Sequence, residues 1–176
     1  MNIWHDLSND RVKEEEFTAV IEITKGSKAK YELDKETGMI MLDRVLSTSM
    51  VYPANYGFIP KTLSDDGDPL DVLVLCSESL ISLSLVECKP IAVIKMIDGG
   101  ENDEKIVAVA KSDKFYNKYS DINELPAHIF DEMVHFFKSY KALENKFCDI
   151  TGVENSDSAK RYIREAIARY NSKYAK

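Results

Sequence analysis

The first two thirds of this chain consist of short runs in which apolar residues return at every second position. Phe17, Ala19, Ile21 and Ile23 share one parity, whereas Glu22 has the other. Residues two apart along a strand project on the same face, so this alternation predicts a half-buried strand with Glu22 facing away from the apolar row. Comparable strand-like runs follow at 28–34, 39–46, 72–76, 90–97 and 105–110.

The last third of the chain changes to the spacing of amphipathic helices. Between residues 126 and 144, apolar side chains recur three or four positions apart, and Pro126 suits a first helical turn. A second helical run begins near Ser156 or Asp157, either of which suits an N-cap, and extends to Tyr170. Strands first and helices last indicate an α+β fold, a small barrel or curled sheet with helices packed outside.

The size and charge of the chain narrow its class. With 176 residues, 44% of them hydrophobic, it can bury one sizeable core, and no linker interrupts it, so we expect a single domain, 1–176. Thirty acidic residues against 23 Lys and Arg give a net charge of −7, which disfavours binding to nucleic acid or to an anionic membrane. Its start lacks the features of a signal peptide, and no run approaches the ~20 apolar residues of a membrane span. We therefore expect a cytoplasmic protein.

Four carboxylates, Asp65, Asp66, Asp68 and Asp71, lie within seven positions just before the apolar run 72–76. Carboxylates ~4 Å apart repel by roughly 4 kcal/mol per pair at the effective dielectric of a protein surface, so this crowding suggests a bound cation. The alternative is a surface turn, because Asp, Gly and Pro favour turns for backbone reasons. The spacing does not match an EF-hand loop. A D-x-D phosphotransfer motif would follow a buried strand, whereas here the apolar run comes after the aspartates.

A second acidic patch follows the apolar run 90–97, and its members are Asp98, Glu101, Asp103 and Glu104. Alone, this patch fits a solvated hairpin turn at Gly99 and Gly100. Two acidic loops at strand ends are also what a shared oxygen-only site for hard cations requires. Magnesium takes a few carboxylates and several waters, which leaves positions for the phosphate groups of a substrate.

The run DGDPLDV, from Asp66 to Val72, resembles the signature of the soluble family I inorganic pyrophosphatases of the bacterial type. Further blocks agree with that family in order and spacing, namely VIEI around Glu22, KYELDKETG at 30–38, DRVLSTSMVYPANYGFIPKTLS at 43–64 and HFFKSYK at 135–141. The resemblance implies a five-stranded OB-like β-barrel with helices packed outside, the main helices lying in the C-terminal third. It also implies hydrolysis of inorganic pyrophosphate to two orthophosphates, several Mg²⁺ per active site with Mn²⁺ or Zn²⁺ as substitutes, and a homohexamer.

The same resemblance implies roles for individual residues. Asp68 would be the general base that takes a proton from the attacking water. The residues implied to bind metal are Asp66, Asp71, Asp98 and Asp103. Those implied to grip phosphate oxygens are Lys30, Arg44, Tyr56, Tyr140 and Lys141. Those implied to complete the cavity are Glu22, Glu32, Tyr52 and Lys105.

Each of these residues also has an ordinary structural interpretation. Lys30 and Glu32 could form a surface ion pair, the tyrosines could be core aromatics, and Glu22 could be an exposed strand residue. A chain that kept the barrel without the chemistry would be an OB-like binding module, and hydrolysis of an organic phosphate is a third hypothesis. The chain departs from the family at Gly99, where many members have glutamate. This departure predicts weaker affinity for the later-binding metals or a changed metal preference.

Overall fold

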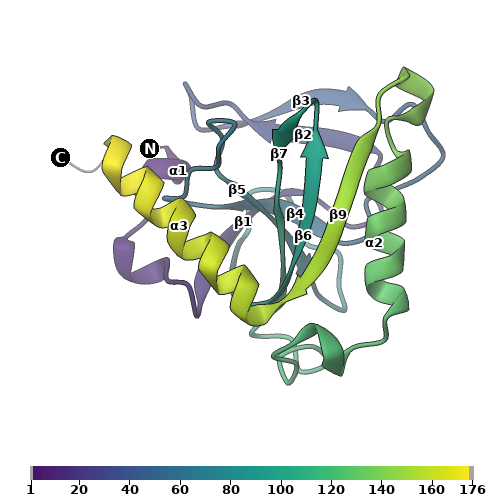
Figure 1. Ribbon diagram of the computed structural model, residues 1–176. Helices are drawn as coiled ribbons and strands as arrows, with labels where there is room; N and C mark the ends of the chain where they lie inside the picture. The colour runs from purple at the N-terminus through teal and green to yellow at the C-terminus, as the bar shows by residue number, and fades with distance from the viewer. Residues whose placement is uncertain (1, 175–176) are drawn as a thin grey trace.

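Five strands close into a ring in the computed structural model, which describes residues 2–174 (Figure 1). In order of pairing they are β1 (Phe17–Ile23), β4 (Asn55–Ile59), β5 (Leu70–Leu75), β8 (Lys105–Ala110) and β6 (Leu85–Asp98). β6 pairs with both β8 and β1, which closes the ring. β5 and β8 run parallel, whereas the other neighbours in the ring run antiparallel. The predicted α+β fold with a five-stranded OB-like barrel is confirmed.

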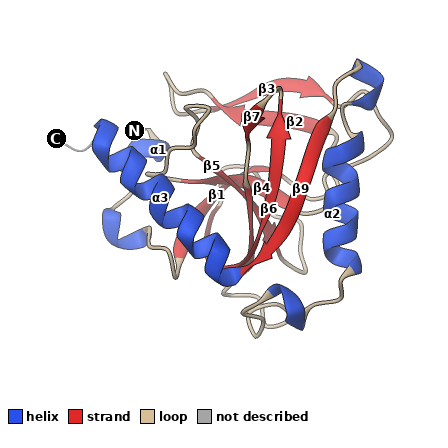
Figure 2. Ribbon diagram, in the orientation of Figure 1, coloured by secondary structure: helices blue, strands red, loops and turns tan. Residues whose placement is uncertain are grey.

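Two long helices pack against different sides of the barrel (Figure 2). They are α2 (His128–Ser139) and α3 (Ser156–Tyr174), so the main helices do lie in the C-terminal third. The short helical segments are α1 (Ile3–Asp6), η1 (Asn9–Arg11), η2 (Ile122–Glu124) and η3 (Ala142–Glu144). Of the expected domain 1–176, Met1, Ala175 and Lys176 lie outside the described residues. No helix within 2–174 is long and apolar enough to cross a membrane.

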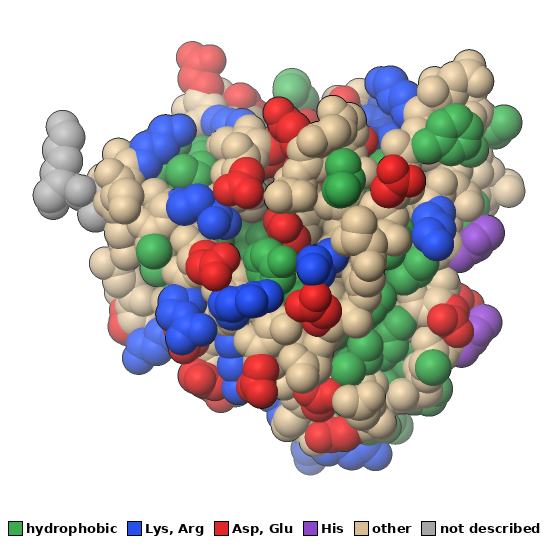
Figure 3. Space-filling model, in the orientation of Figure 1, with side chains coloured by type: hydrophobic (Ala, Val, Ile, Leu, Met, Phe, Trp, Pro, Cys, Tyr) green, Lys and Arg blue, Asp and Glu red, His purple; other side chains and the backbone are tan. Residues whose placement is uncertain are grey.

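The helix ends differ from the sequence prediction in two respects. The side chain of Asn155 accepts a hydrogen bond from the Ser158 backbone N–H at 3.1 Å, so Asn155 caps α3 instead of Ser156 or Asp157. The helix predicted to extend to Glu144 ends as α2 at Ser139, and the chain continues into η3. Acidic and basic side chains are interspersed on the face of the molecule that Figure 3 shows. Just before α3 in the sequence, Glu154 forms an ion pair with Lys95 at 2.9 Å.

The barrel wall is buried on both of its faces. Neighbouring residues of β5 enter different hydrophobic clusters: Leu73 belongs to the cluster of Phe136 in α2, and Val72 to that of Ile163 in α3. A strand covered on both faces reads as a continuous apolar run. The same holds for β1, which was predicted to be half-buried but is buried at all seven positions. Even Glu22 is only 6% exposed, so the alternative interpretation of Glu22 as an exposed strand residue is wrong.

A two-stranded hairpin stands apart from the ring and leans over β1. It consists of β2 (Ala29–Leu33) and β3 (Ile40–Val45) and pairs Lys30 with Arg44. The side chain of Leu33 packs with Trp4 and other apolar residues next to β1. The hairpin thereby covers the face of β1 from which Glu22 projects.

The sequence analysis did not predict three strands, namely β4, β7 (Glu101–Asn102) and β9 (Cys148–Asn155). β9 pairs along β6, from Ala92 opposite Asn155 to Asp98 opposite Cys148, although its sequence is largely polar. β4 lies between the predicted strands 39–46 and 72–76, where no strand was predicted, and it contains Gly57 at a point of close approach to β1. A Cβ at Gly57 would lie 1.8 Å from the Val20 carbonyl oxygen, so only glycine fits there.

Candidate active site

A cavity of about 350 Å³ opens between the hairpin, the β4–β5 loop, the ends of β5, β6 and β8, and the end of α2. Every residue predicted for the site lines this cavity, with the exception of Arg44. The lining members of the predicted set are Glu22, Lys30, Glu32, Tyr52, Tyr56, Asp66, Asp68, Asp71, Asp98, Asp103, Lys105, Tyr140 and Lys141. They come from positions as far apart as 22 and 141, so the barrel brings together residues that are remote in the sequence.

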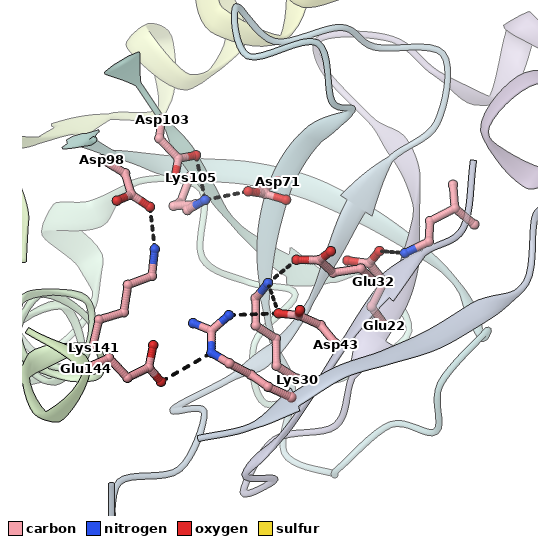
Figure 4. A network of polar contacts seen from close by, with 12 residues as sticks. Glu22, Lys30, Glu32, Asp43, Asp71, Asp98, Asp103, Lys105, Lys141 and Glu144 are labelled. Carbon is pink, nitrogen blue, oxygen red and sulfur yellow. Dashed lines mark hydrogen bonds and ion pairs between the residues drawn. The ribbon is translucent and has the colours of Figure 1, made fainter. Parts of the chain in front are cut away.

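Lys105 forms the buried centre of the site. Its register position in β8 is directly beside Asp71 in β5. Its ammonium nitrogen lies 2.5 Å from an oxygen of Asp71 and 2.6 Å from one of Asp103 (Figure 4). Burial alone would lower the pKa of Lys105, but these two carboxylates outweigh burial and raise it. Lys105 is therefore a cation at neutral pH, held between two of the predicted metal ligands.

A second ion pair joins the end of β6 to the segment after α2. The Lys141 ammonium lies 2.5 Å from an oxygen of Asp98. Burial raises the pKa of Asp98, but the contact with Lys141 outweighs burial and leaves that pKa below its ordinary value. Asp98 is therefore an anion at neutral pH, as a metal ligand must be.

Three tyrosines form the apolar wall of the cavity. Tyr52 packs on Phe136 with ring centroids 4.8 Å apart, and Tyr140 stacks on the same ring at 4.9 Å. The pKa values of Tyr52, Tyr56 and Tyr140 are raised, chiefly by burial. All three remain neutral phenols at neutral pH and can donate hydrogen bonds. The three tyrosines are therefore both core aromatics and cavity residues, because each ring is buried and also borders the cavity.

The acidic β4–β5 loop is an ordered turn. The Asp66 side chain accepts a hydrogen bond from the Asp68 backbone N–H at 2.9 Å, and the Asp68 carbonyl accepts one from the Ser64 N–H at 2.7 Å. Gly67 has φ +86°, a left-handed conformation that glycine adopts without strain. The turn interpretation was thus correct for the backbone, and its carboxylates nevertheless line the cavity.

Glu22 is a buried carboxyl that closes the floor of the cavity. It accepts a hydrogen bond from the Leu33 backbone N–H at 2.8 Å, which links β1 to the hairpin. Burial, with a further contribution from the Asp71 charge, raises the pKa of Glu22 to about 8. The carboxyl is therefore mostly protonated at neutral pH in the described structure.

The hairpin carries a chain of ion pairs that sequence reasoning found only in part. Lys30 and Glu32 form the ion pair that was the alternative interpretation of these two residues, and Lys30 also lies 2.9 Å from Asp43. Arg44 contacts Asp43 at 2.7 Å, and its Nε lies 3.3 Å from Glu144. These contacts direct Arg44 along the hairpin and toward η3, and Arg44 does not line the cavity.

Lys35 is a cavity residue that the sequence analysis did not assign. It lies just beyond β2 and forms an ion pair with Asp68. Its position within the block KYELDKETG was the available signal, but the block alone does not say what Lys35 contacts. Only the folding of the hairpin over the acidic loop brings the two side chains together.

The donor atoms of the cavity suit a hard divalent cation. Within residues 2–174, no three acidic, histidine or cysteine side chains converge closely enough to form a ready-made metal cage. Asp71 and Asp103 instead share the ammonium of Lys105. All the predicted ligands are carboxylates, and oxygen donors of this kind fit magnesium or a similar ion, with water and substrate completing its coordination.

Comparison with known proteins gives the class of this molecule. A family model described as inorganic pyrophosphatase matches residues 19–171. The chain is 44% identical over 171 residues to soluble inorganic pyrophosphatase 2 of Chlamydomonas reinhardtii, covering 97% of this chain and 89% of the relative. It is 46% identical over 167 residues to soluble inorganic pyrophosphatase 1 of Arabidopsis thaliana, covering 95% and 79%.

Solved structures agree with these relatives. The inorganic pyrophosphatase of Thermus thermophilus superposes with a TM-score of 0.92 at 38% identity, covering 97% of this chain and 99% of that one. That of Helicobacter pylori gives 0.89 at 42% identity, covering 94% and 99%. The chain belongs to the inorganic pyrophosphatase family. It is thus an enzyme that hydrolyses inorganic pyrophosphate to two orthophosphates, and the resemblance noted in its sequence is confirmed.

Proposed function

We propose that this chain hydrolyses pyrophosphate with magnesium as its cofactor and Asp68 as its general base. The supporting observation is the composition of the cavity, in which acidic side chains able to hold cations share one space with basic groups able to hold phosphate. A pyrophosphate ion is a polyanion, and a carboxylate-lined cavity would repel it without cations. The crowding of carboxylates in the sequence therefore has a chemical purpose once cations are bound.

Asp68 suits the role of base because its side chain remains partly exposed to the cavity and to solvent. Its side chain is 51% exposed, and its ion pair is made with Lys35 rather than with the buried Lys105. The turn hydrogen bonds from Ser64 and to Asp66 fix its backbone. In the proposed step, a carboxylate oxygen of Asp68 takes a proton from the water whose oxygen forms the new bond to phosphorus. The bond from that phosphorus to the bridging oxygen breaks, and the second phosphate leaves with the bridging oxygen and its electron pair.

Four carboxylates would hold the cations, and they are Asp66, Asp71, Asp98 and Asp103. When bound, the cations would lower the pKa of the attacking water and neutralise charge on the phosphoryl groups. Lys105 holds Asp71 and Asp103 close to each other when no metal ion is bound, since its ammonium contacts both. Mn²⁺ and Zn²⁺ accept the same oxygen donors and are the expected substitutes.

Basic and phenolic groups would bind the substrate. These residues are Lys30, Arg44, Tyr56, Tyr140 and Lys141. Lys30 and Lys141 already line the cavity and would stabilise charge on the leaving phosphate. Arg44 would do so by giving up its contact with Glu144 and turning toward the cavity. Four residues would support the site. Glu32 contacts Lys30, and Tyr52 packs on the Phe136 ring against which Tyr140 stacks. Glu22 holds the hairpin through Leu33, and Lys105 holds Asp71 and Asp103.

The test is phosphate release from pyrophosphate at neutral pH, with millimolar magnesium and with excess chelator. We expect rapid release that requires the metal, and no turnover of ATP or sugar phosphates under magnesium. Asp68→Asn should lower turnover by about 10²-fold or more, because general bases supply at least that factor. Asp65→Asn changes an exposed carboxylate of the same loop and should leave turnover near normal. Near-normal turnover of a folded Asp68→Asn variant would contradict the assigned base.

We also propose that residues 1–176 form one domain in a cytoplasmic homohexamer. The match of a single family model to residues 19–171 supports one domain. The family resemblance supports the hexamer, and the exposed apolar row Ile81, Leu83 and Leu85 offers a surface for subunit contact. Light scattering gives the mass in solution, and the mass of a single chain would contradict the oligomer.

A further inference from the structure

One ion pair crosses the mouth of the cavity. The ammonium of Lys35, in the turn between β2 and β3, contacts an oxygen of Asp68 in the β4–β5 loop. Neither residue lies in the barrel, so the pair joins two loops that extend from different strands. The other cavity carboxylates with lysine partners use different lysines, since Asp71 and Asp103 contact Lys105, Asp98 contacts Lys141 and Glu32 contacts Lys30.

The turn that carries Lys35 is held rigid by its own hydrogen bonds. The Asp34 carboxylate accepts from the backbone N–H groups of Glu36 and Thr37, both at 3.3 Å, and from the Thr37 hydroxyl. The Asp34 carbonyl accepts from the Gly38 N–H at 2.7 Å, and Gly38 has φ +73°, which glycine adopts freely. A long flexible side chain is therefore presented from a backbone of fixed shape.

Contacts from outside the hairpin fix where that turn sits. The Lys35 carbonyl accepts a hydrogen bond from the Asn2 side-chain amide at 2.8 Å, and Asn2 also caps α1. On the other side, the Leu33 N–H donates to the buried Glu22 carboxyl at 2.8 Å. The turn that carries Lys35 and the strand residue just before it are therefore both held against the rest of the molecule. The ammonium of Lys35 is directed at Asp68.

Stability does not account for this pair. The side chains of Lys35 and Asp68 are 53% and 51% exposed. Ion pairs of such exposure typically add little to the free energy of unfolding, because water screens them and side-chain entropy opposes them. A weak ion pair between two fixed loops can still restrict the orientation of a carboxylate. Such restriction matters for catalysis, because a small displacement of a reacting group lowers the rate strongly.

We propose that Lys35 is a positioning residue that orients the carboxylate of Asp68 for proton transfer. The proposal rests on the proposed role of Asp68 as general base. Lys35 acts through Asp68 and therefore affects turnover more than substrate affinity. A lysine that gripped pyrophosphate directly would have the opposite effect and raise KM.

The first test compares Lys35→Ala, Lys35→Arg and Lys28→Ala by steady-state kinetics at saturating magnesium. We expect Lys35→Ala to lower kcat roughly 10- to 100-fold with KM within about twofold of the parent, the size of loss that mispositioning of a reacting group produces. Lys35→Arg keeps the positive charge and should restore most of kcat. Lys28 is an exposed lysine at the other end of the hairpin with no ion pair within residues 2–174, so its replacement should leave both constants unchanged. Unchanged kcat in Lys35→Ala, or a loss confined to KM, would overturn the proposal.

The second test separates this proposal from the role of Asp68 itself. Lys35→Ala is introduced into Asp68→Asn, and the double variant is compared with both single variants. If Lys35 works through Asp68, the second change should cause less than a twofold further loss, because the oriented carboxylate is already gone. If the two losses multiply, Lys35 acts independently and the positioning role is wrong, although Asp68 remains the base. Normal turnover of Asp68→Asn would instead refute Asp68 as the general base, and the positioning role of Lys35 would be wrong with it.

Discussion

The burial of Glu22 predicts a protein whose stability decreases as pH rises through neutrality. The pKa of Glu22 is raised from 4.5 to about 8 by burial and by Asp71. The native state therefore keeps a proton on this carboxyl that the unfolded chain releases. Protons bound more tightly by the native state stabilise it at low pH, and this contribution is lost as pH rises from about 4.5 to about 8.

The magnitude follows from the difference between the two pKa values. One pKa unit corresponds to about 1.4 kcal/mol, so the full loss is roughly 5 kcal/mol above pH 8 and about 3 kcal/mol at pH 7. Glu22→Gln removes the titration while its side-chain carbonyl can still accept the hydrogen bond from Leu33. The stability of the variant relative to the parent should therefore rise by these amounts between pH 4.5 and pH 9.

The assay is urea unfolding in excess chelator, followed by the fluorescence of Trp4, the single tryptophan, which is 3% exposed. The change with pH is the quantity of interest, because any constant effect of the substitution cancels. Glu87→Gln, at an exposed glutamate of β6, serves as the matched control for replacing a carboxylate by an amide. If the gap between Glu22→Gln and the parent is the same at pH 5 and pH 8, the argument from burial is wrong.

Three further substitutions test other parts of the structure. Gly57→Ala places a Cβ 1.8 Å from the Val20 carbonyl oxygen, so β1 and β4 must separate. We expect the free energy of unfolding, measured by thermal unfolding, to fall by about 3 kcal/mol or more. A decrease under about 1 kcal/mol would contradict this packing. Lys105→Met removes the ammonium shared by Asp71 and Asp103. In urea unfolding with chelator, the free energy of unfolding should fall by about 3–5 kcal/mol. Millimolar magnesium should recover part of this decrease. An equal loss with and without magnesium would show that the cation does not bind between these carboxylates. Gly99→Glu adds a carboxylate and should lower the magnesium concentration needed for half-maximal activity. The melting temperature should fall, because φ at this position is +59°, which strains any residue other than glycine. Gly99→Gln carries the same strain without the charge and should leave the required magnesium concentration unchanged.

The limits of sequence reasoning here have physical causes. Strands covered on one or both faces leave a strong apolar signal, so β1, β2, β3, β5, β6 and β8 could be predicted. β9 could not, because it pairs with the long β6 by backbone hydrogen bonds while most of its side chains are polar or partly exposed. β4 was hidden because its Gly57 serves a close approach to β1 that no local pattern records.

The sequence by itself determined the order of six of the strands and of the two long helices, the family to which the chain belongs and the identity of most cavity residues. It could do so because those features depend on residue type and spacing. Only the tertiary structure decided which groups meet: Lys105 with Asp71 and Asp103, and Lys35 with Asp68. It also decided that Glu22 is a buried, mostly protonated carboxyl and that Arg44 contacts Glu144 outside the cavity. Ion pairing and desolvation depend on distances between residues remote in the chain, and these distances exist only after the barrel has closed and the hairpin has folded over it.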